Sequence, residues 1–366
     1  MNNAAIARQT LWQCRQFRPL QLQRHSQPTL PSAWTLSPGP AIPSPRRAFG
    51  TTRPTASTKI TTETTSTEAT GAACPTTIAR PRLSPLPFIY LRNLPYERSS
   101  ALQQLLVDRQ LRLRKEREVL RAQAAVAAAK EVGQNDDRSS PDSTGDIANT
   151  HKEDGSEDLV LLVEHTPTYT NGRRNRGAQG ISDQEVLRLQ NSGAVYVESL
   201  RGGEITYHGP GQLVAYPIMD LKPIKLSVRC YVSYLEKSII ATCAELGVKT
   251  ITTENTGVWI NGQKKIAAIG VHVQRYITSH GLALNCNTDL EFFNQIVACG
   301  LTGKETTSLS KELKDPSVDV QAVIPNFLKG FGATFNREFV ALSETRPELE
   351  KAIQEYIQTG DPGTLS

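Results

Sequence analysis

The chain has 366 residues, of which 38% are hydrophobic, and it carries a formal net charge of +5. This length accommodates one large domain or two medium ones, and no apolar stretch is long enough to span a membrane. Residues 1–49 hold six arginines, no lysine and no acid, so the remainder of the chain is close to neutral. This balance argues against nucleic-acid binding, which requires a basic stripe.

The N-terminal segment has the composition of a mitochondrial presequence. Its arginines are accompanied by serine and glutamine, and the first acidic residue of the chain is Glu63. Such an arginine-rich, acid-free composition is typical of a transit peptide, and Arg47-Ala48-Phe49 resembles a processing site. We therefore predict a presequence over residues 1–49 and import into the mitochondrial matrix, with a generic basic tail as the alternative.

A single ordered domain is predicted over residues 86–340. Residues 50–85, rich in Thr, Ser and Pro, are expected to form a disordered linker, and residues 341–366 a C-terminal tail. A first strand near residues 87–91 precedes a helix over 98–132, whose start should pack on the domain and whose later half should be solvated. Together with the polar residues that follow, this helix gives a helical and disordered insertion at about 108–157.

The remaining elements follow from hydrophobic periodicity and from start and stop signals. Residues 158–165 form a continuous apolar run typical of a buried strand, and 166–172 are read as a turn. Ser182 and Glu185 form a capping box at the start of a helix, and Asn261-Gly262 is a hairpin signal. The other predicted elements are strands over 194–200, 213–218, 257–260, 265–271 and 279–285, and helices over 182–192, 227–247, 292–297 and 317–331, the last with Ser317 as N-cap and a kink at Pro325.

The predicted fold class is mixed α/β (α+β), because hairpins replace the regular βαβ alternation of a doubly wound sheet. The six cysteines show no CxxC pair and no zinc-ribbon or disulfide-framework spacing. We therefore expect a reducing compartment and cysteines that are mostly buried small hydrophobes. Cys230 and Cys243 in particular are expected to pack within a helix.

A glycine-rich loop, residues 201–212 (RGGEITYHGPGQ), stands between two predicted strands. Its four glycines allow the backbone to approach a ligand closely. A tight turn between strands is the alternative. The Arg, Tyr and His of the same loop favour a ligand site, although composition alone does not name the ligand.

Three segments in order resemble lipoyl(octanoyl) transferases. They are the loop at 201–212, the segment KKIAAIG at 264–270 followed by HGLALN at 280–285, and the pair Cys299-Gly300. The resemblance begins near residues 94–96, skips the insertion and continues from 161 to about 331. It implies a single domain like that of biotin and lipoate protein ligases. It also implies transfer of octanoyl from octanoyl-acyl carrier protein to a lysine of lipoyl-domain proteins, such as glycine cleavage H protein or 2-oxoacid dehydrogenase E2 subunits.

The resemblance also implies the site residues, with no metal and no cofactor. Cys299 matches the family's nucleophile and Lys265 the lysine that activates it, and Ala298 stands where a proline is expected. The residues that match the acyl-pocket segments are Arg201, Gly202, Gly203, Glu204, Ile205, Thr206, Tyr207, His208, Ala268, Ile269, Gly270, Gly281, Leu282 and Ala283.

The expected chemistry is a two-step acyl transfer. A thioester donor exchanges its acyl group with a cysteine thiolate without ATP, and an amine then forms the amide. A nearby lysine lowers the thiol pKa and takes the proton of the amine. Backbone N–H groups near Cys299 and in the loop are expected to hold the oxyanion, and Tyr207, Ile269 and Leu282 to line an apolar tunnel.

Several alternatives stay open at this point. Lys264 could replace Lys265 as the functional lysine. We prefer Lys265 because strand alternation places it on the same face as Ile269. His208 and His280 are expected to fix the site through hydrogen bonds, and His165 is either structural or catalytic. The rival functions are an ATP-dependent lipoate or biotin ligase and a non-catalytic protein that binds lipoyl domains.

Overall fold

The computed structural model describes residues 74–75, 84–132, 157–175 and 180–365. The predicted presequence, nearly all of the predicted linker and residues 133–156 of the predicted insertion lie outside the described residues.

An eight-stranded sheet is the centre of the described domain. Its order is β10-β8-β9-β6-β2-β1-β11, and β7 pairs with β8 as the predicted hairpin requires. The strands β2, β6 and β9 are buried along their whole length, as expected for strands that are covered on both faces. The strands are β1 (Leu86–Leu94), β2 (Leu159–His165), β6 (Gln212–Ile218), β7 (Val258–Trp259), β8 (Lys264–Gln274), β9 (Ile277–Asn285), β10 (Glu305–Thr306) and β11 (Phe339–Ala341).

A small sheet adds a second layer of strands. It has the order β4-β3-β5, with β3 (Thr168–Asn171), β4 (Val195–Glu198) and β5 (Thr206–His208). The prediction of a turn over 166–172 is therefore wrong for β3, which is buried and pairs with strands on both sides. Its Thr-Tyr-Thr sequence suits a pleated, half-buried surface. The glycine-rich loop contributes β5, so this loop belongs to a sheet and does more than connect two strands.

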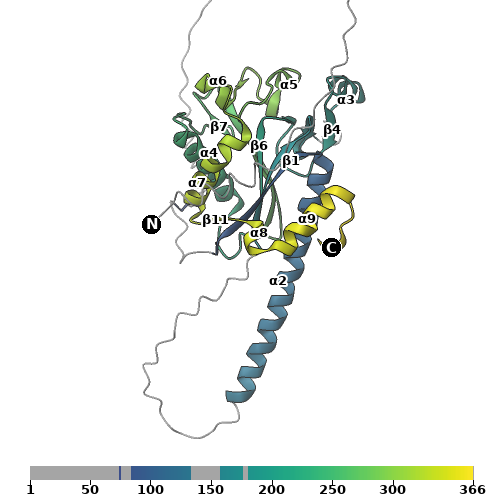
Figure 1. The fold of residues 1–366 in the computed structure, drawn as a ribbon, viewed down its shortest axis with the longest axis vertical. Helices are drawn as coiled ribbons and strands as arrows, with labels where there is room; N and C mark the ends of the chain where they lie inside the picture. Colours follow the sequence, from purple (N-terminus) through teal and green to yellow (C-terminus); the bar gives the residue numbers. More distant parts are fainter. Residues whose placement is uncertain (1–73, 76–83, 133–156, 176–179, 366) are drawn as a thin grey trace, which may run out of the picture. The chain divides into compact units, whose positions relative to one another are not determined.

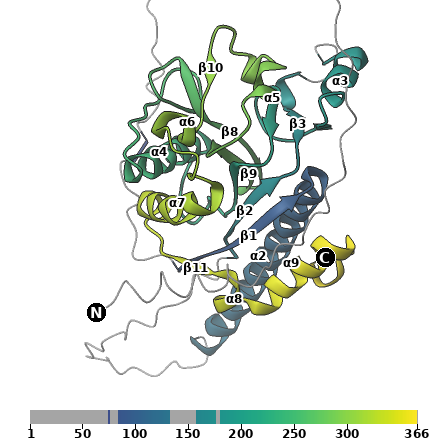
Figure 2. The same ribbon diagram turned by 45° about the horizontal axis from the view of Figure 1, so that its top comes forward.

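Two helical layers cover the opposite faces of the large sheet (Figures 1 and 2). On one face, Leu213 and Ala215 of β6 belong to the hydrophobic cluster of α4 (Val228–Glu245) and α7 (Val320–Phe335). On the other, Val214 and Tyr216 belong to the cluster of α2 (Tyr96–Val132) and α9 (Pro347–Thr359). This alternation along one strand follows from the period of two in a β-strand. The mixed α/β fold class is confirmed.

The helix boundaries agree with the predicted caps at two positions. The Ser182 hydroxyl accepts a hydrogen bond from the backbone of Glu185, and Ser227 caps α4 in the same way. For α7 the N-cap is Asp319 instead of Ser317, and the helix continues through Pro325 without a break. The remaining short elements are η1 (Arg173–Asn175), α3 (Asp183–Gln190), α5 (Glu291–Asn294), η3 (Ala298–Gly300), α6 (Leu309–Leu313), α8 (Leu342–Thr345) and η4 (Gly363–Leu365).

The C-terminal residues are folded, which differs from the predicted tail. In α9, Leu349, Ile353 and Tyr356 are buried against the large sheet, at the i, i+4, i+7 spacing of an amphipathic helix. The helix α2, which packs on the same face of the sheet as α9, behaves as predicted: Leu102 and Leu106 are buried, whereas residues 115–127 are mostly exposed. Among the described residues, no helix combines the length and apolarity needed to cross a membrane.

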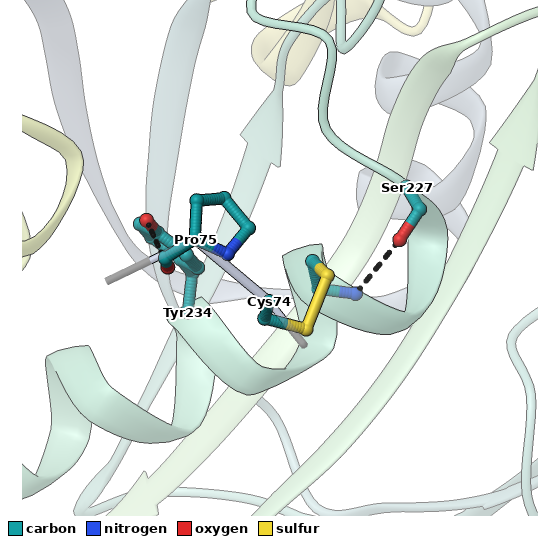
Figure 3. Close-up of a disulfide and its surroundings, with 5 residues drawn as sticks. Cys74, Pro75, Ser227 and Tyr234 are labelled. Carbon is teal, nitrogen blue, oxygen red and sulfur yellow. Dashed lines mark hydrogen bonds between the residues drawn. A yellow bond between two sulfur atoms is a disulfide. The ribbon is translucent and has the colours of Figure 1, made fainter. Parts of the chain in front are cut away.

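A disulfide joins Cys74 to Cys230 at the start of α4 (Figure 3). The expectation that Cys230 only packs within its helix is therefore wrong, whereas Cys243 is free and buried. The Tyr234 hydroxyl donates to the carbonyl of Pro75 at 2.9 Å, so two bonds hold this short segment on α4. A sequence separation of 156 residues gives no spacing signal from which the pair could be predicted.

A buried ion pair joins the segment that follows α7 to the residue that precedes β2. Arg337 follows α7, and its Nη1 lies 2.5 Å from Oδ2 of Asp158, directly before β2, with both side chains at most 6% exposed. The Arg337 Nε also donates to the carbonyl of Ser84 before β1. A charge buried in this way is costly when its partner is removed.

We predict that Arg337→Leu lowers the free energy of unfolding by about 3–5 kcal/mol, because Asp158 is left as a buried charge without its cation. Urea unfolding at neutral pH measures the change. Lys329→Leu is the matched control, because its ion pair with Glu245 is largely exposed, and it should cost less than about 1 kcal/mol. Equal losses in the two variants would contradict the assignment.

Candidate active site

A cavity lies on the α2 side of the large sheet, below the glycine-rich loop. The strands β8 and β9 contribute small residues to it, and η3 contributes Cys299. Its lining residues are Tyr96, Arg201, Thr206, His208, Val214, Tyr216, Ala268, Ile269, Gly270, His280, Gly281, Leu282, Ala283 and Cys299. A second cavity shares four of these residues, Thr206, Ala268, Ala283 and Cys299, and adds Lys265, Ala267, Gln212, Asn285, Phe293, Ala298 and Thr306.

Cys299 occupies a strained turn against β5. Its φ of 57° and ψ of 22° are left-handed, and its backbone N–H donates to the Ile205 carbonyl at 2.8 Å. Gly300 is also left-handed, and a Cβ there would lie 1.8 Å from Oε2 of Glu204. Only glycine fits at this position, so the Cys-Gly pair has a stereochemical reason that is independent of catalysis.

Three backbone N–H groups of the Cys299 turn donate hydrogen bonds within the fold. Those of Cys299, Gly300 and Leu301 donate to the carbonyls of residues 205, 297 and 298, and Gly202 of the loop donates to Val271. This differs from the expectation that these groups hold an oxyanion, because the turn uses them for its own folding. Among the described residues the Thr206 hydroxyl has no hydrogen-bond partner, and it lines both cavities together with Cys299.

Lys265 is buried at the start of β8, although the strand-alternation argument for it does not hold. Lys265 pairs with Trp259 and Ala267 with Val258, so Ile266 is an extra residue in a bulge. A bulge shifts the faces of the residues that follow it. Ile269 packs toward α4 and α7, whereas Lys265 lines a cavity with Cys299.

Two neighbours, Trp259 and Gly257, define the path of the Lys265 side chain. The ammonium lies 5.2 Å from the centroid of the Trp259 ring, a distance at which a cation–π interaction is attractive. Gly257 has a φ of +130°, and a Cβ there would lie 2.4 Å from Cε of Lys265. The lysine stem therefore passes through a space that only glycine leaves open.

A chain of buried hydrogen bonds connects the loop to the lysine strand. The Nδ1 of His208 lies 2.7 Å from Oε1 of Gln212, which therefore accepts its proton. The Gln212 amide donates to Asn285, and the Asn285 amide donates to the Thr307 carbonyl. The Thr307 N–H then donates to the carbonyl of Lys265 at 2.9 Å. As expected, His208 fixes the site through hydrogen bonds.

The end of the cavity opposite to Cys299 is a cluster of neutral aromatic side chains. His165 accepts from the Tyr216 hydroxyl through Nε2 and donates from Nδ1 to the Leu94 carbonyl, which fixes its tautomer. Burial lowers the pKa of His165 to about 4. Burial, followed by the charge of Arg201, lowers the pKa of His280 to about 3. Burial, followed by the neighbouring His165 and Arg201, holds the pKa of His208 well below its ordinary value.

Arg201 is a buried cation whose polar contacts are hydroxyl and carbonyl oxygens. Its guanidinium donates to the hydroxyl and carbonyl of Thr170 on β3 and to the carbonyls of Gly202 and Glu204. The side chain therefore holds the loop against the small sheet while its stem lines the cavity.

The structure brings together most of the expected site residues. Cys299, Lys265, Arg201, Thr206, His208, Ala268, Ile269, Gly270, Gly281, Leu282 and Ala283 line the two cavities. Gly202, Gly203, Glu204 and Ile205 do not line either cavity. Tyr207 points the other way from Thr206 and His208, and its ring stacks on Phe292, with 4.4 Å between the ring centroids. Tyr207 therefore does not line the cavities, which differs from the expectation that it lines the tunnel.

Sequence reasoning did not place Tyr96, Tyr216 and His165 at this site. Tyr96 and His165 lie outside the three motif segments, at the start of α2 and the end of β2. Tyr96 lies two residues after the end of the apolar strand β1, and His165 is the last residue of β2. A polar side chain at or just after the end of an apolar strand is the signal that could have indicated these two residues. Lys264 does not line either cavity, which favours Lys265.

Comparison with known proteins identifies the family of the chain. Residues 145–332 match the model of the lipoyl protein ligase A/B catalytic domain. The chain is 48% identical over 195 residues to the octanoyl-[acyl-carrier-protein]:protein N-octanoyltransferase LIPT2, mitochondrial, of Danio rerio, which covers 53% of this chain and 81% of that protein. It is 48% identical over 178 residues to a probable octanoyltransferase of Schizosaccharomyces pombe, covering 47% and 76%. A crystal structure of lipoate-protein ligase A bound with ATP is 13% identical, with a TM-score of 0.48, and covers 76% of this chain and 95% of that one.

The chain therefore belongs to the lipoyl protein ligase A/B catalytic domain family. The acyltransferase class expected from its sequence is confirmed by this family and by the relatives named octanoyltransferase.

We predict that the free energy of unfolding falls as the pH decreases from 7 to 5. The unfolded state binds protons on His165, His208 and His280 below pH 6.5, whereas the folded state keeps these rings neutral. Each such histidine contributes a slope of up to about 1.4 kcal/mol per pH unit below its unfolded pKa. Urea unfolding at several pH values measures the slope.

His165→Phe is the informative variant for this prediction. It removes one of the neutral histidines, so its slope should be shallower, even though the lost hydrogen bonds lower its stability at pH 7. A slope as steep as that of the unmodified chain would show that His165 is not neutral in the folded state.

Proposed function

We propose that this chain transfers an octanoyl group from octanoyl-acyl carrier protein to a lysine of a lipoyl-domain protein through an acyl-Cys299 thioester. The observation that carries the proposal is that Cys299 and Lys265 line one cavity. Cys299 also lines a neighbouring pocket, to which β8 and β9 contribute four residues that are Ala or Gly. Similarity to octanoyltransferases supports the acyl group.

The first half-reaction forms the acyl-enzyme. The thiolate of Cys299 attacks the thioester carbonyl carbon, a new thioester bond forms, and the bond to the carrier sulfur breaks. The carrier leaves as a thiol after its sulfur takes up a proton from the Lys265 ammonium, which becomes a neutral amine. One thioester replaces another, so ATP is not required. The Lys265 ammonium, which lines the same cavity as Cys299, provides a positive charge that attracts the attacking thiolate.

The oxyanion of this step needs a hydrogen-bond donor. Because the N–H groups of the Cys299 turn already donate within the fold, we assign this role to the Thr206 hydroxyl, which lines both cavities beside Cys299. A donor that is fixed in a site from which water is excluded stabilises the developing charge strongly.

The second half-reaction transfers the acyl group to an amine. The lysine amine of the acceptor attacks the carbonyl of acyl-Cys299, an amide bond forms, and the carbon–sulfur bond breaks. Lys265 in its neutral form takes the proton of the attacking amine and returns it to the leaving sulfur. The acceptors in this proposal are lipoyl domains, such as glycine cleavage H protein or 2-oxoacid dehydrogenase E2 subunits.

The mitochondrial matrix is the proposed location. The acid-free, arginine-rich composition of residues 1–49 supports it, and so does similarity to relatives named mitochondrial. Sequencing the N-terminus of the protein purified from the organelle tests this proposal, and an intact Met1 in the matrix would contradict it.

We predict that Cys299→Ser lowers ATP-independent octanoyl transfer at least about a thousandfold, because the nucleophile is lost. Intact-mass measurement after incubation with octanoyl-acyl carrier protein should show one octanoyl adduct on Cys299 in the unmodified chain. Cys243→Ala is the matched control, since Cys243 is free and buried outside both cavities. Transfer that requires ATP and survives in Cys299→Ser would point to a ligase, and no adduct at all would favour a binding protein.

We predict that Thr206→Val lowers the rate constant of Cys299 acylation by about 10²–10³, since the oxyanion loses its donor. Thr206→Ser should retain most of the rate, because it keeps the hydroxyl. Rapid-quench measurement of the adduct separates this rate from donor binding. An unchanged rate constant with a raised donor KM would assign Thr206 to binding instead.

A further inference from the structure

The pocket has a reactive end and a closed end. The four residues shared with the Lys265 cavity, Cys299 among them, mark the reactive end. The opposite end is lined by Tyr96, Tyr216 and His280, whose side chains are at most 4% exposed. An acyl chain that enters beside Cys299 therefore meets buried side chains at the far end.

His280 faces this closed end because of an unusual backbone conformation. It pairs with Val271 in a continuous antiparallel register, and Val271 packs on the α4 and α7 side of the sheet. Regular alternation would place His280 on that side as well. Instead its ring makes an edge contact with the ring of Tyr216, 6.0 Å between centroids, on the α2 side.

The reason for this reversal is a φ of 53° at His280. A left-handed conformation is unfavourable for a non-glycine residue, and such residues gather at functional sites. The strained peptide is held by α2, where Oε1 of Gln103 accepts the His280 N–H at 2.7 Å. The fold thus maintains a strained backbone conformation at His280. This conformation directs the imidazole ring toward the end of the pocket.

The stretch of β9 that lines the pocket is about as long as a medium-length acyl chain. From Ala283, shared by both cavities, to His280 the strand β9 advances three residues, which is about 10 Å at the rise of a β-strand. An extended eight-carbon acyl chain has a comparable length. A chain with several more carbons would have to displace the imidazole.

We propose that His280 is a specificity-determining residue that closes the acyl pocket and sets the length of the acyl chain accepted on Cys299. This inference rests on the proposed octanoyl transfer and adds the group that limits its substrate. His280 acts by occupying the end of the pocket, and its ring takes no part in the chemistry.

The test compares acylation of Cys299 by octanoyl- and dodecanoyl-acyl carrier protein in the full chain. His280→Gly suits the left-handed backbone and removes the ring. We expect it to raise the dodecanoyl-to-octanoyl ratio of acylation rate constants by about tenfold or more, because several methylene groups gain a binding space. The ratio is independent of the fraction of active protein.

Two further variants make the outcome decisive. Asn336→Gly is the matched control: Asn336 has the same φ of 53° but caps α7, so its ratio should stay unchanged. His280→Asn introduces a shorter side chain that still tolerates the left-handed region, and we expect it to raise the dodecanoyl-to-octanoyl ratio as well. This variant provides the test if His280→Gly does not fold. If both His280 variants are acylated by octanoyl-acyl carrier protein with an unchanged dodecanoyl-to-octanoyl ratio, the role of His280 is overturned and the proposed function still stands. No acylation of the unmodified chain by either donor would overturn the proposed function with it.

Discussion

The buried guanidinium of Arg201 is the interaction on which the site depends. A buried cation is tolerated only when its donors are satisfied, and here the acceptors are oxygens of β3 and of the loop itself. The loop must therefore fold around the arginine. Ile205 is the residue after Glu204 in this loop, and its carbonyl accepts a hydrogen bond from the N–H of Cys299. The orientation of Cys299, the proposed nucleophile, thus depends on a residue to which we assign no reactive group.

The same charge influences the aromatic cluster at the closed end of the pocket. Burial is the main cause of the low pKa values of His208 and His280, and the cation of Arg201 lowers both further. Neutral imidazoles can lie beside hydrocarbon at a much lower desolvation cost than imidazolium ions. A positive charge that is fully bonded within the fold therefore helps to keep the neighbouring pocket uncharged, as an aliphatic acyl chain requires.

The sequence predicts the parts of this fold that have local causes, and it fails where long-range contacts decide. The buried strand β2, the hairpin at Asn261-Gly262 and the caps of α3 and α4 follow from pattern and side-chain chemistry. The strand β3 depends on partners elsewhere in the chain, and the bulge at Ile266 changes a face that strict alternation would assign. For the site, the motifs indicate the segments, but only the structure separates Tyr207, which is buried against Phe292 away from the pocket, from its neighbour His208.

Two left-handed residues line the pocket, Cys299 at its proposed reactive end and His280 at its proposed closed end. Each has its N–H bonded to an acceptor on a different element, the Ile205 carbonyl for Cys299 and the Gln103 amide oxygen for His280. In an isolated segment neither conformation would persist, because each costs free energy that local sequence does not return. The packing of α2 and of the glycine-rich loop on the sheet supplies that free energy. The position of the sulfur and the end of the pocket are therefore both properties of the assembled domain.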